Sequence, residues 1–184
     1  MNRVLLLTLV LILGATLAFA QGYDNGRIGI FADNSTFNPS WCLPAATGLL
    51  YVYFLHVNAM GATASQWAAP PPTCLTAVHL ADLPVFAINL GNTASGITIG
   101  YGTCNTGSFH IMTALYQLTT VGTCCVWRVV PDPGLASGKI EIPDCEFNMT
   151  YGTGGAAIFG TNPNCCSDPT EDTTWGAVKA LYTE

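Results

Sequence analysis

Three histidines are the first residues that could do chemistry in this sequence, as general acid–base groups or as zinc ligands: His56, His79 and His110. A zinc site built from them would need all three to converge, and nothing in their spacing indicates that they do. His56 and His110 lie inside apolar stretches, where a structural imidazole is expected. The histidines therefore predict neither a catalytic nor a metal site, and we expect no metal and no cofactor.

The 11 acidic residues are the second source of chemistry. Most stand beside turn residues, as Asp132 does before a proline and Asp144 before a cysteine, where a carboxylate commonly caps a turn. The cluster of Asp168, Glu171 and Asp172 lacks the glycine and the final glutamate of an EF-hand calcium loop. A carboxylate pair of the glycosidase type needs only to meet in space, so a hydrolase stays as a remote alternative. Otherwise we expect no enzyme, because no serine stands in a Gly-x-Ser-x-Gly motif.

Eight cysteines, an even number within the part of the chain expected to be exported, predict structural disulfides rather than a metal site. They are Cys42, Cys74, Cys104, Cys124, Cys125, Cys145, Cys165 and Cys166. Cys104 and Cys145 each precede a vicinal pair by about twenty residues. This spacing suggests one bridge within each interval, with Cys42 and Cys74 taking the spare members of the pairs. Eight cysteines allow 105 connectivities, so other pairings stay open.

The first twenty residues have the pattern of a secretion signal. Arg3 gives a positive start, 4–13 is an apolar run, and small residues at Ala18 and Ala20 suit cleavage. We therefore expect a signal peptide over 1–20 and a single secreted domain over 21–184, extracellular or periplasmic, with no membrane span after cleavage. Only 9% of the residues are charged, and 11 acids outnumber 5 basic residues. This composition excludes a disordered chain, a coiled coil and a nucleic-acid binder.

Short β-rich runs that end at glycine, proline or asparagine recur along the chain and fit strands. They span 27–32, 49–57, 85–89, 96–102, 109–118, 126–130, 139–142 and 156–159, with weaker candidates at 66–69 and 75–79. Residues 96–101 and 139–142 alternate, which predicts one buried and one wet face. Residues 49–55 are apolar throughout and predict a central strand covered on both sides. Without strand–helix alternation, the pattern predicts an all-β, antiparallel β-sandwich.

The tail is the one segment that predicts a helix, over 172–182. Asp172 offers an N-cap, and four apolar side chains recur on one face. These are Trp175, Val178, Leu181 and Tyr182. The helix either packs on the end of the sandwich as a short lid or docks a partner protein.

Aromatic residues are the remaining candidates for binding, because exposed rings could stack on sugars. The candidates are Trp41, Trp67, Tyr101, Tyr116 and Trp127. In a sandwich, however, most such rings belong to the core.

Several segments carry a resemblance to a known group of proteins. They are 28–33 with Cys42 beyond it, 96–104, 142–145 and 174–182, of which the ending Trp-Gly-x-x-Lys-x-Leu-Tyr is the most specific. In these segments the chain resembles secreted, cysteine-containing proteins of environmental bacteria to which no activity is assigned. The resemblance spans most of the mature chain and implies a bacterial exported β-sandwich of the cohesin-like or immunoglobulin-like kind. It implies no catalytic residue.

These observations favour a secreted, non-enzymatic β-sandwich that acts as an envelope, matrix or adhesion module. Its low charge suits self-association, because little repulsion opposes sheet edges that meet. The alternative is a carbohydrate- or protein-binding module that uses exposed aromatics or the C-terminal helix. The expected partners are accordingly a cell surface, a glycan, a protein or a second copy of the chain, and no nucleic acid.

Overall fold

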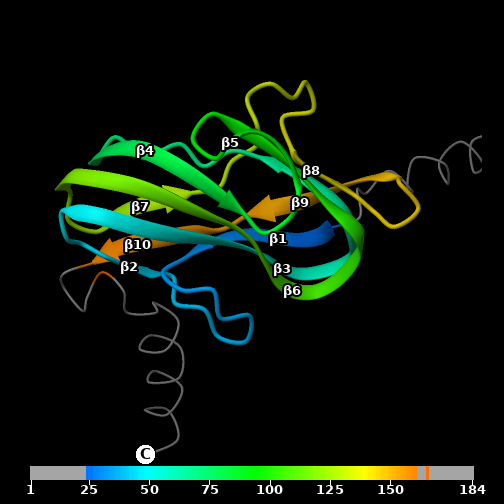
Figure 1. Ribbon diagram of the computed structural model, residues 1–184, viewed down its shortest axis with the longest axis horizontal. Coiled ribbons are helices and arrows are strands. Elements are labelled where there is room, and N and C mark those ends of the chain that lie inside the picture. The colour runs from blue at the N-terminus through cyan, green and yellow to red at the C-terminus, as the bar shows by residue number, and fades with distance from the viewer. Residues whose placement is uncertain (1–23, 161–164, 166–184) are drawn as a thin grey trace, which may run out of the picture.

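The computed structural model describes residues 24–160 and Cys165, and the elements of this part are ten strands (Figure 1). They are β1 (Asp24–Phe31), β2 (Cys42–Pro44), β3 (Gly48–Trp67), β4 (Leu75–Pro84), β5 (Ile88–Asn92), β6 (Gly96–Val121), β7 (Cys125–Arg128), β8 (Ile140–Pro143), β9 (Met149–Gly154) and β10 (Ala156–Gly160). The predicted signal peptide and the predicted helix at 172–182 lie outside the described residues. Within them, no helix is long and apolar enough to cross a membrane.

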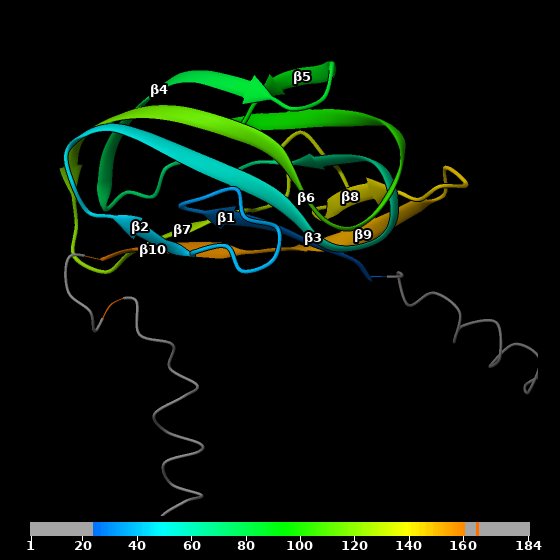
Figure 2. The same ribbon diagram turned by 60° about the horizontal axis from the view of Figure 1, so that its bottom comes forward.

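The strands pack as the two layers of a β-sandwich. Seven strands form one strongly curved sheet in the order β1-β9-β8-β3-β6-β4, with β5 beside β6 and β1 also beside β3. Three strands form a second sheet in the order β2-β10-β7. In Figure 2, β3, β4 and β6 lie in the upper layer, and β1, β2, β7 and β10 lie in the lower one. The predicted all-β sandwich is confirmed, although β1 with β9 and β2 with β10 pair in parallel.

β3 and β6 are far longer than the strands predicted in their place. The runs predicted at 49–57 and 66–69 are parts of one 20-residue strand, and two runs within 96–118 belong to one strand of 26 residues. Both strands bend without ending, because their mutual pairing contains register shifts, and Asn58 and Gly61 of β3 take positive φ angles. Residues that resemble turn signals in the sequence are therefore bulges inside continuous strands.

The first half of β3 has one buried face, not the two predicted for 49–55. Val52 and Phe54 are fully buried, whereas Leu49 is 62% and Tyr51 49% exposed. The prediction is wrong because the lower layer covers the inner face alone in the described part of the chain. The alternation predicted elsewhere is confirmed, since one side of each strand is buried: Ile97, Ile99 and Tyr101 in β6, and Ile140 and Ile142 in β8.

Four of the five candidate aromatics are core residues, as expected for most such rings in a sandwich, so these four do not form a sugar-stacking platform. Trp67, Trp127 and Tyr116 are fully buried and Tyr101 is 4% exposed. The indole Nε1 of Trp127 donates to the Ala69 carbonyl oxygen at 3.0 Å, and the Trp127 and Tyr116 rings meet edge to face at 4.8 Å. A buried indole with a satisfied N–H is a packing anchor, so these rings hold the layers together.

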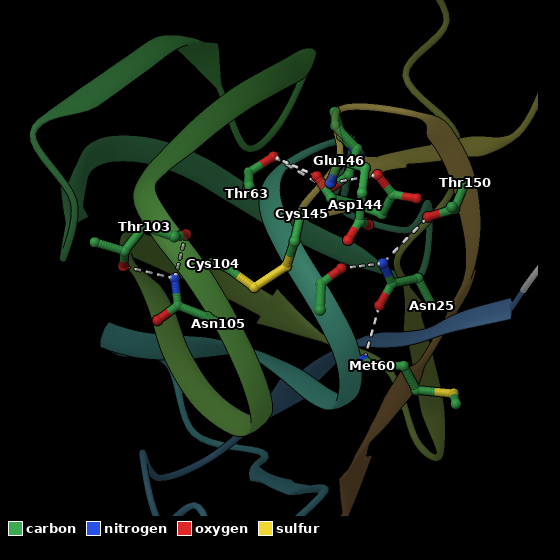
Figure 3. The surroundings of a disulfide bond; sticks show 12 residues. Asn25, Met60, Thr63, Thr103, Cys104, Asn105, Asp144, Cys145, Glu146 and Thr150 are labelled. Carbon is green, nitrogen blue, oxygen red and sulfur yellow. Dashed lines mark hydrogen bonds between the residues drawn. A yellow bond between two sulfur atoms is a disulfide. The ribbon is translucent and has the colours of Figure 1, made fainter.

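Three disulfides between described residues connect segments that are distant in sequence. They are Cys74–Cys125, Cys104–Cys145 and Cys124–Cys165. Cys42 is also disulfide-bonded. The predicted bridges within the 104–125 and 145–166 intervals are wrong, whereas Cys74 does take a member of a vicinal pair. The intervals mislead because the bend of β6 carries Cys104 to the turn between β8 and β9, where Cys145 lies (Figure 3).

Candidate interaction site

An uncharged, apolar surface covers the outer side of β3, β6 and β4, and we call it the apolar face. The strand register places side chains in rows across it: Leu49 beside Gln117 and Val78, Tyr51 beside Leu115, and Tyr53 beside Thr113 and Leu83. The Val78 side chain is 56% exposed and that of Leu83 is 50% exposed, and Leu49 and Tyr51 are exposed to a similar degree. A contiguous group of exposed apolar side chains on an outer sheet face is a candidate interaction surface.

The ionisable side chains of β4 lie away from the apolar face. Asp82 accepts hydrogen bonds at 2.8 Å from both the backbone N–H and the hydroxyl of the buried Thr93. His79 lies 3.0 Å from the same carboxylate and packs its ring against the buried Tyr116. Both groups therefore belong to the inner side, and the described strands bring no charged side chain to the apolar face.

β4 also forms the edge of its sheet. Among the described strands it pairs with β6 along one side, and it ends the strand order. An edge strand offers backbone N–H and C=O groups to a further strand, and natural edges are commonly protected by charge or proline. β4 has Pro84 at its last position, turns its acid inward and has two register shifts in its pairing with β6, so its edge carries several of these protections.

The histidines do not converge, and His56 is part of a buried network. Its Nε2 lies 2.8 Å from the Asn25 carbonyl oxygen and its Nδ1 3.1 Å from the Tyr101 hydroxyl. Because a carbonyl only accepts, Nε2 carries the proton and Nδ1 accepts from Tyr101. Burial lowers the pKa of His56, against the opposing effect of the bond to Asn25, and burial raises the pKa of Tyr101. The ring is thus held neutral as a structural group.

We expect the free energy of unfolding to fall on acidification. The reason is that His56 binds a proton at a higher pH in the unfolded chain than in the folded protein. Above the ordinary histidine pKa of about 6.5 neither state is protonated, so the contribution is fully present there. Below it, the free energy of unfolding should fall by up to about 1.4 kcal/mol per pH unit until the lowered pKa is reached. His110, whose pKa burial also lowers, adds to this slope. Denaturant unfolding of wild type and His56→Gln between pH 7.5 and 5 measures the difference in slope, and equal slopes would contradict it.

The acids beside predicted turns do cap turns. Asp132 accepts from the Gly134 N–H at 2.8 Å, and Asp144 accepts from the N–H groups of Glu146 and Asn148 at 2.9 and 2.8 Å. Among the described residues, no three His, Cys, Asp or Glu side chains group as a metal site. The acids at 168, 171 and 172 and the predicted docking residues Trp175, Val178, Leu181 and Tyr182 lie outside the described residues, so their roles stay predictions.

Comparison with known proteins finds likeness in fold and not in sequence. No family profile and no curated protein sequence matches the chain. A non-cellulosomal cohesin from Archaeoglobus fulgidus is similar at a TM-score of 0.45 and 13% identity, over 74% of this chain and 93% of that one. A cohesin module of a Clostridium perfringens family 33 glycoside hydrolase gives 0.46 and 1%, over 72% and 96%. The cohesin of a Clostridium thermocellum type I cohesin–dockerin complex gives 0.46 and 8%, over 76% and 96%.

The strand pairing and the disulfides show that the described chain is a disulfide-linked β-sandwich, and the three solved structures named above are cohesin modules.

Proposed function

We propose that this protein is a secreted, non-enzymatic structural module that assembles with further copies of itself through the apolar face. The observation that carries the proposal is a three-strand surface of large apolar side chains to which no charged side chain of those strands points. Export in an oxidising compartment is supported by the disulfides, which persist where thiols are not kept reduced.

A second copy fits this surface better than an arbitrary partner. The chain has a formal net charge of −6 and only 9% charged residues, so the repulsion between two copies is small. The apolar face is where that repulsion is weakest, because its rows hold leucine, valine, tyrosine, threonine and glutamine. Two identical faces related by a two-fold axis bury the same side chains on both sides.

The size of the face sets the strength of the contact. Three strands about 4.8 Å apart and three rows about 7 Å apart cover roughly 300 Å². A stable interface buries about 800 Å² per partner, so the face alone supports weak association. Weak contacts repeated over many copies suit an envelope or matrix, where multivalency supplies the strength.

We expect Val78→Lys to weaken self-association at least tenfold, because the ammonium would lose water on the dry side of the contact. Met149→Lys in β9 adds the same charge at a side chain that is 50% exposed on another strand, and it should associate like wild type. Light scattering and sedimentation over a range of concentrations measure both. A wild-type protein that stays monomeric throughout, or equal weakening by the two variants, would sink the proposal. Binding to a different protein through the same face would replace the second copy as the occupant.

A further inference from the structure

The positive charge of the described chain gathers on one outer face, away from the apolar face. Arg27, Arg128 and Lys139 are all exposed and are the basic residues within 24–160. Arg27 pairs with Thr153 of β9, Arg128 pairs with Ala156 of β10, and Lys139 immediately precedes Ile140, which pairs with Gly152. The three cations therefore surround the short stretch where β9 passes into β10 in the lower layer (Figure 2).

These cations are available to a ligand. The ion pair found among the described residues joins His79 to Asp82 on the other layer and involves none of them. The nearest acid in the adjoining strand is Glu141 of β8, which pairs with Tyr151 of β9. Arg27 pairs with Thr153, two residues further along β9. The Glu141 carboxylate borders the positive face next to Lys139, whose ammonium lies over the Tyr151 ring.

A first hollow on this face combines a cation with an aromatic ring. Its volume is about 340 Å³, and it is lined by Arg27, Gly29, Phe31, Trp41, Gly155 and Ala156. Two glycines in its lining are closely packed: a Cβ on Gly155 would lie 2.8 Å from the Gly29 Cα and 3.5 Å from the Arg27 Cδ. A Cβ on Gly29 would lie 2.5 Å from the Phe31 ring. A larger residue at either position would displace the neighbouring strand or the Phe31 ring.

Trp41 is the candidate aromatic that the core does not absorb. Trp67 and Trp127 are fully buried, whereas Trp41 is half-buried and lines the first hollow beside Arg27. An indole face at a surface hollow stacks on the C–H face of a sugar ring, and a guanidinium pairs with a carboxylate or sulfate in a bidentate way. Together the two side chains match a sugar that carries an acidic group.

The second hollow repeats this chemistry on the other side of β9. It has a volume of about 310 Å³, and its lining includes Arg128, Lys139 and Tyr151. The Lys139 ammonium lies 4.3 Å from the centroid of the Tyr151 ring, which holds the cation over the hollow. Arg27 and Lys139 flank β9 on its two sides, about 10 Å apart at the spacing of β-strands. One extended saccharide chain can therefore reach both hollows.

We propose that this face binds an acidic polysaccharide, a sugar chain with carboxylate or sulfate groups. Trp41 stacks on one ring while Arg27 pairs with its acidic group, and Arg128 and Lys139 pair with an acidic group farther along the chain. The site is independent of the apolar face, and a module that both assembles and binds acidic glycan would hold a matrix together.

Titration of the purified, oxidised protein with alginate and heparin fragments, followed by calorimetry, tests this site, with dextran of equal length as the neutral probe. We expect binding of at least one acidic polymer and none of dextran. Arg27→Gln and Trp41→Leu should each weaken it tenfold or more, Trp41→Phe should keep most of the affinity, and Lys139→Gln should weaken it less than Arg27→Gln.

Val78→Thr on the apolar face is the matched control and should bind like wild type. Dextran bound as tightly as alginate or heparin would overturn the proposal. So would single-stranded DNA bound more tightly than either acidic polymer, or full affinity in a folded Trp41→Leu protein. These assays measure ligand affinity, whereas the Val78→Lys experiment measures self-association. A negative result for the polysaccharide would therefore leave the self-association result unchanged.

Discussion

Removing the Cys104–Cys145 disulfide, by replacing both cysteines with serine, should lower the free energy of unfolding by about 3 to 4 kcal/mol. The bridge closes a loop with a sequence separation of 41. Opening a loop of that size raises the conformational entropy of the unfolded chain, which lowers the free energy of unfolding by about this amount. The remaining bridges already restrict part of the same loop, which puts the expected value below that for an unlinked chain. Denaturant unfolding under oxidising conditions measures it.

Two comparisons separate this chain-entropy effect from local damage. Replacing both cysteines with alanine removes the same bridge with a different side chain, and the loss should agree within about 1 kcal/mol. Cys74–Cys125, with a separation of 51, should cost a similar amount when removed in the same way. A loss below 1 kcal/mol for the serine variant would show that the bend of β6 is held by packing and not by the bridge.

Asn25→Ala should cost about 3 kcal/mol, because one buried amide holds the bulge of β3 against β1 and β9. The Asn25 Nδ2 donates to the Gly61 carbonyl oxygen at 2.7 Å and to the Thr150 hydroxyl at 3.2 Å, and its Oδ1 accepts from the Met60 N–H at 2.8 Å (Figure 3). Alanine removes all three hydrogen bonds and leaves the backbone groups of the bulge without these partners. Each lost bond is worth about 1 kcal/mol, and an unsatisfied buried group costs more.

Asn105 supplies the matched control for this prediction. Its amide bonds only the carbonyl and hydroxyl oxygens of the neighbouring Thr103, at 2.9 and 3.2 Å, on an exposed part of β6 (Figure 3). Asn105→Ala should therefore change the free energy of unfolding by less than about 0.5 kcal/mol. Equal losses for the two alanine variants, measured by the same denaturant titration, would contradict the role given to Asn25.

Most strands could be predicted from the sequence, because burial of one face of a strand requires apolar and polar residues to alternate along it. Ile97 and Ile99 in β6 and Ile140 and Ile142 in β8 show this directly. The sequence did not predict β2 and β9. The strand expected at 85–89 is β5, which spans Ile88–Asn92. β2 has three residues and β9 contains two glycines, so neither carries enough alternating apolar residues for the pattern to emerge.

Local composition thus determined the all-β class, the turn-capping acids and the suitability of the cysteines for disulfides, since each depends on neighbouring residues or on residue counts. Tertiary structure decided which cysteines meet, because the bends of β3 and β6 set distances that sequence spacing does not carry. It also decided that residues 49–55 leave Leu49 and Tyr51 exposed, and that Arg27, Trp41 and Lys139 share one face. Those neighbours come from strands far apart in the chain, and strand pairing and register bring them together.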